Sequence, residues 1–202
     1  MWRVASLVLL TMGVVGLTHA AGDPEAGKAK TQLCAGCHGA DGNSVNPLWP
    51  NLAGQHPKYL EAQLRAFKSG ARKDPTMSPM AATVQDGDIP DIAAYFAAQT
   101  VKASAVTASE EVLAEGRKIY LGGIAETRTA ACAGCHGPRG QGNGPAGFPA
   151  LAGQKAQYVA KQLKDFRAGT RATDPNGMMR DVAKRMTDAE IAAVAAYIAS
   201  LR

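Results

Sequence analysis

Two short motifs of identical sequence contain the residues best suited to chemistry. The sequence Cys-Ala-Gly-Cys-His at 34–38 recurs at 132–136, 98 residues later. Two cysteines separated by two residues can form thioether bonds to the vinyl groups of a haem, and the adjacent histidine is then placed to bind the iron. The pair of motifs therefore predicts two c-type haems, attached through four thiols and each bound by one imidazole: Cys34, Cys37, Cys132, Cys135, His38 and His136.

Other uses of a Cys-x-x-Cys pair fit this chain less well. A redox disulfide of the thioredoxin kind is expected next to a βαβ pattern, and no alternating strand pattern longer than a few residues is present. A zinc site needs four ligands, whereas each half supplies two cysteines and one or two histidines. A structural disulfide would leave the repeated histidine unexplained.

Methionine is the expected second ligand of each iron, since a thioether is a common axial donor in cytochromes. Aligning the last helices of the two halves at an offset of 102 pairs Met77 with Met179. Met80 stays an alternative in the first half, because a gap in its proline-containing loop could shift the register. The other candidates are interpreted as packing or surface residues, or belong to the leader: Met178 and Met186 as apolar filler, His56 as a surface residue opposite Lys155, and His19 as part of the leader.

The halves around these motifs are copies of one another. Leu-Ala-Gly-Gln at 52–55 recurs at 151–154, and several further identities follow in the same order, so the chain is a tandem duplication. Helical signals dominate both copies. We expect helices from Asp23 into the first motif, from Ser109, over 58–69 and 156–168, and from a Thr187–Glu190 capping box. The last of these should bury one apolar face: Ile191, Val194, Tyr197, Ile198 and Leu201.

The predicted architecture is all-α, with two small domains that each wrap around one haem. Residues 21–100 form the first domain, residues 101–109 the linker, and residues 110–202 the second domain. Residues 1–20 have the form of a cleaved signal peptide, with Arg3, an apolar stretch over 4–17 and Ala20 before the cut. The mature chain should therefore begin at Ala21 and work outside the cytoplasm.

Composition narrows the function classes. A hydrophobic fraction of 46% excludes a disordered chain, and a net charge of +5 without a long basic run disfavours nucleic acid as a partner. The charge is uneven: residues 21–100 hold 7 basic and 8 acidic side chains, whereas residues 101–202 hold 14 and 9. Basic residues of the second half, such as Arg167 and Arg171, are expected to orient the protein on a partner.

Filled axial positions indicate electron transfer, since neither iron would have an open site for a substrate. A dihaem peroxidase is the enzyme alternative and would need a vacant or displaceable ligand. A haem subunit bound to a larger dehydrogenase is a third interpretation that the residues leave open.

Together, the paired motifs resemble the cytochrome c4 family of periplasmic dihaem proteins, over the whole of residues 21–202. The resemblance also rests on Pro-Asn-Leu-Ala-Gly-Gln at 50–55 and its partner at 149–154. It implies two class I cytochrome c domains, with axial pairs His38/Met77 and His136/Met179. It further implies that the carbonyls of Pro50 and Pro149 orient the two histidines. Gly27 and Gly116 would allow the first and last helices of each domain to cross, near Tyr95 and Tyr197. The haem propionates would face one another across the domain interface.

The same resemblance implies the partners. We expect a respiratory donor such as a quinol-oxidising complex, a membrane haem–copper terminal oxidase as acceptor, and peripheral association with that membrane.

Overall fold

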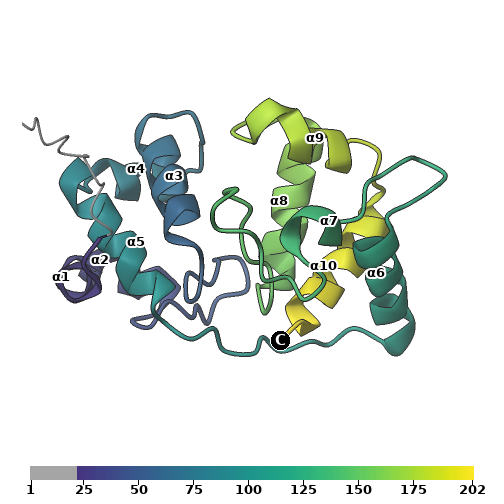
Figure 1. Ribbon diagram of the computed structural model, residues 1–202, viewed down its shortest axis with the longest axis horizontal. Coiled ribbons are helices and arrows are strands. Elements are labelled where there is room, and N and C mark those ends of the chain that lie inside the picture. Colours follow the sequence, from purple (N-terminus) through teal and green to yellow (C-terminus); the bar gives the residue numbers. More distant parts are fainter. Residues whose placement is uncertain (1–21) are drawn as a thin grey trace, which may run out of the picture.

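The computed structural model describes residues 22–202 and consists of two groups of helices joined by an extended segment (Figure 1). The predicted signal peptide, residues 1–20, lies outside the described residues. Between 22 and 202 there are no strands, only two isolated bridges, Ile124–Thr129 and Asn143–Phe148. The all-α prediction is confirmed. No helix in this range is long and apolar enough to cross a membrane.

The first group contains five helices and one 3₁₀ turn: α1 (Pro24–Lys30), α2 (Gln32–His38), α3 (Pro57–Lys68), α4 (Met77–Ala82), η1 (Asp86–Asp88) and α5 (Ile89–Ala97). The second group also has five helices and one 3₁₀ turn, but its turn comes before the fourth helix instead of after it: α6 (Glu110–Gly122), α7 (Ala133–His136), α8 (Ala156–Ala168), η2 (Pro175–Gly177), α9 (Met178–Ala183) and α10 (Asp188–Ser200). In each group the first helix packs on the last, and the long middle helix packs on the last helix and on the short one that follows it. The segment between α5 and α6 runs along one edge of both groups (Figure 1).

Glycines make the helix crossings possible. A β-carbon placed on Gly27 would lie 2.0 Å from the carbonyl oxygen of Asp91, and one on Gly116 would lie 2.1 Å from that of Ala193. The same positions approach Cβ of Tyr95 and Tyr197 at 2.9 and 2.8 Å. The main chains of α1 and α5 are therefore in contact, as are those of α6 and α10, which agrees with what the family resemblance implies.

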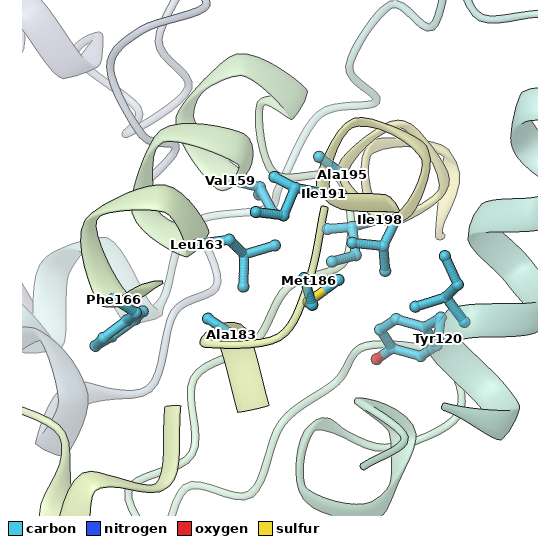
Figure 2. Packing of buried hydrophobic residues seen from close by; sticks show 11 residues of the cluster. Tyr120, Val159, Leu163, Phe166, Ala183, Met186, Ile191, Ala195 and Ile198 are labelled. Carbon is cyan, nitrogen blue, oxygen red and sulfur yellow. The ribbon is translucent and has the colours of Figure 1, made fainter. Parts of the chain in front are cut away.

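The second group has the larger apolar core. Figure 2 shows side chains of α6, α8 and α10 converging there, with Met186 and the fully buried Tyr120 among them. The Tyr120 hydroxyl donates a hydrogen bond of 2.7 Å to the carbonyl of Gly137, directly after the second cysteine motif. The corresponding buried cluster of the first group is smaller and comprises Leu60, Ile92, Ala93 and Phe96.

Two helix predictions differ in detail from the structure. The first helix does not run unbroken into the cysteine motif: it ends at Lys30, where the Thr31 hydroxyl and N–H both bond to the carbonyl of Lys28. α10 buries more than one face, because α6 covers one side of it and α8 another. The predicted capping box at its start is present, with the Thr187 and Glu190 side chains each accepting from the other's main-chain N–H.

Candidate functional site

The two motif histidines occupy equivalent, buried positions at the ends of α2 and α7. His38 Nδ1 lies 2.9 Å from the carbonyl oxygen of Pro50, and His136 Nδ1 lies 2.9 Å from that of Pro149. Since a carbonyl can only accept, Nδ1 carries the proton in both rings and Nε2 keeps a free lone pair. Burial lowers the pKa of both imidazoles, against the opposing effect of the proline carbonyls, and thereby favours the neutral form of both rings. This is the tautomer that a metal-binding histidine needs.

The two cysteines of each motif are three residues apart, about one helical turn, and the second of them directly precedes the histidine. Burial raises the pKa of the Cys34 thiol and raises that of Cys132 to about 11. Redox and metal-binding cysteines need the thiolate and have lowered pKa values. Within residues 22–202, no cluster of three or more His, Cys, Asp or Glu side chains could hold a metal ion. The lack of such a cluster in this part of the chain counts against the zinc alternative.

The two paired methionines lie in equivalent short helices. Met77 is the first residue of α4, half-buried, with its N–H bonded to the Asp74 carboxylate at 3.0 Å. Met179 lies in the first turn of α9 and packs against the core of its group. Met80 is 36% exposed. Met186 is buried, as expected of packing filler, whereas the same expectation is wrong for Met178, which is 38% exposed.

A symmetric set of hydrogen bonds joins the two groups beside the proline loops. The Gln55 side chain bonds both the N–H and the C=O of Ala150, each at 2.9 Å. Gln154 does the same to Asn51, at 2.8 and 2.9 Å. Both glutamines are more than nine-tenths buried. The roles of these glutamines were missed from the sequence, because the repeated Leu-Ala-Gly-Gln was interpreted as a sign of duplication and of family resemblance.

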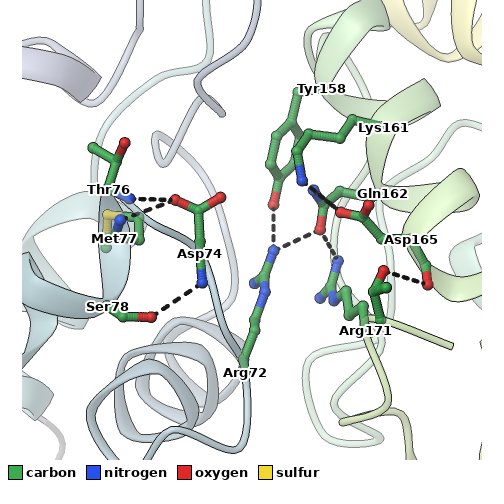
Figure 3. A network of polar contacts seen from close by, with 11 residues as sticks. Arg72, Asp74, Thr76, Met77, Ser78, Tyr158, Lys161, Gln162, Asp165 and Arg171 are labelled. Carbon is green, nitrogen blue, oxygen red and sulfur yellow. Dashed lines mark hydrogen bonds and ion pairs between the residues drawn. The ribbon is translucent and has the colours of Figure 1, made fainter.

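A second symmetric cluster contains two buried arginines (Figure 3). Arg72 bonds Gln63 of its own group and reaches Tyr158 and Gln162 of the other group. Arg171 bonds Gln162 and reaches back to the first group: Tyr59 at 2.9 Å and Gln63 at 3.1 Å. Each guanidinium also lies 4.4 Å over a phenylalanine ring of its own group, Phe67 or Phe166.

The cluster carries positive charge that the described residues do not neutralise. Among residues 22–202, neither Arg72 nor Arg171 forms an ion pair, and Nε of Arg171 is buried without a hydrogen-bond partner. Burial would raise the pKa of the Tyr59 hydroxyl, but the charges of Arg171 and Arg72 outweigh it and lower the pKa. Two unpaired buried cations at the meeting of the two groups suit carboxylates. Haem carries such groups as its propionates.

These positions correct two expectations. Arg171 is 8% exposed and is therefore not a surface charge, and Arg167 is not a free one, because it is ion-paired with Asp188 at 2.5 Å. His56 is not a free surface residue: it is half-buried, and its Nε2 lies 2.9 Å from the carbonyl oxygen of Gln141 in the other group.

Two helical domains, each with paired thiols, a neutral imidazole fixed by a proline carbonyl and a methionine in a following short helix, define a c-type cytochrome with two haem sites. The family model described as Cytochrome c matches residues 24–99 and again residues 113–202. Cytochrome c4 from Pseudomonas aeruginosa is 47% identical over 195 residues, covering 96% of this chain and 96% of that protein. The chain belongs to the cytochrome c4 family of dihaem electron-transfer proteins and binds two c-type haems.

One solved structure and a second relative agree with this assignment. The crystal structure of reduced recombinant cytochrome c4 from Pseudomonas stutzeri superposes with a TM-score of 0.85 at 44% identity, over 90% of this chain and 100% of that one. A further relative, from Stutzerimonas stutzeri, is named a thiosulfate dehydrogenase electron acceptor. It is 42% identical over 83% of this chain and 78% of its own length.

Proposed function

We propose that this protein is a periplasmic electron carrier in which both irons are low-spin, with His38/Met77 and His136/Met179 as axial pairs. The observation that carries the proposal is the fixed Nδ1–H tautomer of both histidines, which leaves Nε2 free in equivalent places of the two domains. When bound, each haem supplies a one-electron couple. The chain supplies two thiols for the attachment of each haem: Cys34 and Cys37 for the first, Cys132 and Cys135 for the second. The proposed domains are residues 21–100 and 110–202, joined by a linker at 101–109.

Met77 is favoured over Met80 as the first methionine ligand. Asp74 accepts hydrogen bonds from the N–H groups of both Thr76 and Met77 at 3.0 Å, which fixes the start of α4. Met77 is half-buried there, whereas Met80 is 36% exposed. A thioether ligand favours the ferrous iron relative to a second histidine and so raises the potential.

The arginine cluster is the proposed counter-charge for the haem carboxylates. Arg72 and Arg171 come from different domains and share the side-chain oxygens of Gln63 and Gln162, so the two positive charges lie together. Propionates directed to this cluster would face one another across the domain interface. Neutralising them there would also reduce the cost of burying both guanidinium groups.

For partners, we propose a respiratory donor such as a quinol-oxidising complex and a membrane haem–copper terminal oxidase as acceptor, with peripheral association at that membrane. The relative named as a thiosulfate dehydrogenase electron acceptor supports a second kind of donor, a periplasmic dehydrogenase. The protein could meet a dehydrogenase either as a free carrier or as its bound haem subunit. Copurification separates these two cases, because a free carrier elutes alone and a bound subunit elutes with the dehydrogenase.

The competing function is a dihaem peroxidase. Two methionine-ligated irons leave no open site for peroxide, so the isolated holoprotein should accept and donate electrons while turning over hydrogen peroxide no faster than a non-peroxidase cytochrome. Substantial peroxidase activity of the protein as isolated would overturn the carrier proposal.

A further inference from the structure

One peptide group separates each motif histidine from the opposite domain. The carbonyl of Pro50 accepts from His38 Nδ1 at 2.9 Å, and the N–H of that same peptide group belongs to Asn51. This N–H donates to Oε1 of Gln154, in the other domain, at 2.8 Å. The chain of contacts therefore runs from imidazole to peptide to glutamine without a gap.

The second domain repeats the arrangement in the opposite direction. His136 Nδ1 donates to the carbonyl of Pro149 at 2.9 Å, and the N–H of Ala150, in the same peptide group, donates to Oε1 of Gln55 at 2.9 Å. Oε1 of Gln55 also accepts the N–H of His56 at 2.9 Å, and Oε1 of Gln154 accepts that of Lys155 at 3.0 Å. Because both donors are main-chain N–H groups, the orientation of each side-chain amide is fixed.

A peptide group transmits polarisation from its N–H to its C=O, because the C–N bond is conjugated. An acceptor on the N–H increases the negative charge on the carbonyl oxygen, which then binds the imidazole N–H more strongly. A stronger bond at Nδ1 makes the imidazole a more basic ligand, and a more basic ligand favours ferric iron. The glutamines are 7% and 8% exposed, so solvent does not screen the effect.

We propose that Gln55 and Gln154 are positioning residues that tune the haem iron of the domain opposite to their own. The proposal rests on the proposed ligation of the irons by His38 and His136. It predicts crossed control: Gln55 acts on the haem at His136, and Gln154 acts on the haem at His38.

A purely structural role for the glutamines predicts a different pattern. If they only hold the domains together, removing either one loosens the whole interface and affects both haems alike, or affects the haem of its own domain. The identity of the haem that responds therefore separates tuning from docking.

The test uses the dihaem holoprotein with Gln55→Met and, separately, Gln154→Met, since methionine keeps the side-chain length and removes both hydrogen-bonding groups. The readouts are the Nδ1–H proton resonances of His38 and His136 in the ferrous protein, assigned by sequence-specific NMR, and the two midpoint potentials. Gln55→Met should shift the His136 resonance upfield and raise the potential of the second haem, leaving His38 and the first haem unchanged. Gln154→Met should do the reverse, so either variant alone tests the relay if the other does not fold.

Lys58→Met is the matched control. Lys58 Nζ donates to the carbonyl of Pro145 across the same interface at 2.8 Å, but it does not touch the relay. This variant should leave both histidine resonances and both potentials unchanged. Equal shifts in both domains after Gln55→Met, a shift confined to its own domain, or no shift at all would overturn the relay.

The wild-type spectrum distinguishes this failure from failure of the ligation. Imidazole protons bound to a ferrous haem iron carry a large upfield ring-current shift. If they are shifted in the wild type but do not respond to Gln55→Met or Gln154→Met, only the relay fails. If His38 and His136 show no such shift, the ligation fails and the relay fails with it.

Discussion

The carbonyl oxygen of Ala193 lies 2.1 Å from the position that a β-carbon on Gly116 would occupy. α6 and α10 are thus in main-chain contact, and the same relationship joins Gly27 of α1 to Asp91 of α5 at 2.0 Å. These contacts hold the first helix of each domain, and with it the cysteine motif that follows, against the last helix.

Gly116→Ala should destabilise the second domain by roughly 1–3 kcal/mol, the usual cost of forcing extra volume into a packed contact. The measurement is denaturant unfolding of the holoprotein. Gly122→Ala is the matched control in the same helix, since a β-carbon there meets nothing within 4 Å. The control should be neutral or stabilising by up to about 1 kcal/mol, as alanine is the better helix former. Equal midpoints for the two variants would contradict the close helix crossing.

Met77→Ala should lower the potential of the first haem by on the order of 0.1 V or more, within the ~0.8 V range that axial ligands span. The measurement is a spectroelectrochemical titration that follows the methionine–iron charge-transfer band. Met80→Ala is the control three residues later in α4 and should leave the band and both potentials in place. If Met80→Ala abolishes the band of the first haem and Met77→Ala does not, the ligand is Met80.

Much of the fold was predictable because its signals are local. The capping box at Thr187, the N-cap at Ser109 and the helical spacing over 156–168 act within one or two turns, and the structure confirms all three. The role of Gly27 and Gly116 at the helix crossings was expected from the resemblance to the cytochrome c4 family, and the structure confirms it.

The contacts between the two domains could not be predicted from the sequence. Arg171 looked like a surface charge because the sequence does not reveal that Tyr59 and Gln63 of the first domain cover it. Gln55 and Gln154 looked like markers of a repeat, since their partners lie 95 and 103 residues away in the chain. The one signal available in the sequence was that a polar glutamine recurs in the otherwise apolar Leu-Ala-Gly-Gln motif, which is a sign that its amide has a buried partner.

Arg139→Glu should slow oxidation of the second haem by hexacyanoferrate by about 2–10-fold at low ionic strength, because it reverses a charge that attracts an anion. Arg139 is exposed and lies three residues after His136, and Cys135 of the same motif is exposed as well. The measurement is stopped-flow oxidation at several salt concentrations, and the difference should vanish as salt screens the charge. Lys28→Glu makes the same change of charge in the first domain and should leave the oxidation rate of the second haem unaltered. A salt-independent effect of Arg139→Glu would contradict electrostatic steering.

The mature protein should begin at Ala21. Signal peptidase acts after small residues such as Ala20, beyond the apolar stretch at 4–17. N-terminal sequencing of the protein from a periplasmic extract measures the start directly. A chain that retains Arg3 and stays with the membrane fraction would instead indicate an uncleaved anchor.

We propose that histidine and methionine bind both irons of this dihaem carrier. A potentiometric titration of the purified holoprotein, followed in the visible spectrum, checks both the number of haems and their ligands. Uptake of two electrons per protein is predicted, with both haems low-spin in either oxidation state and a methionine–iron charge-transfer band in each ferric haem. Uptake of only one electron per protein, or a high-spin haem that binds peroxide, would show that this ligation is wrong.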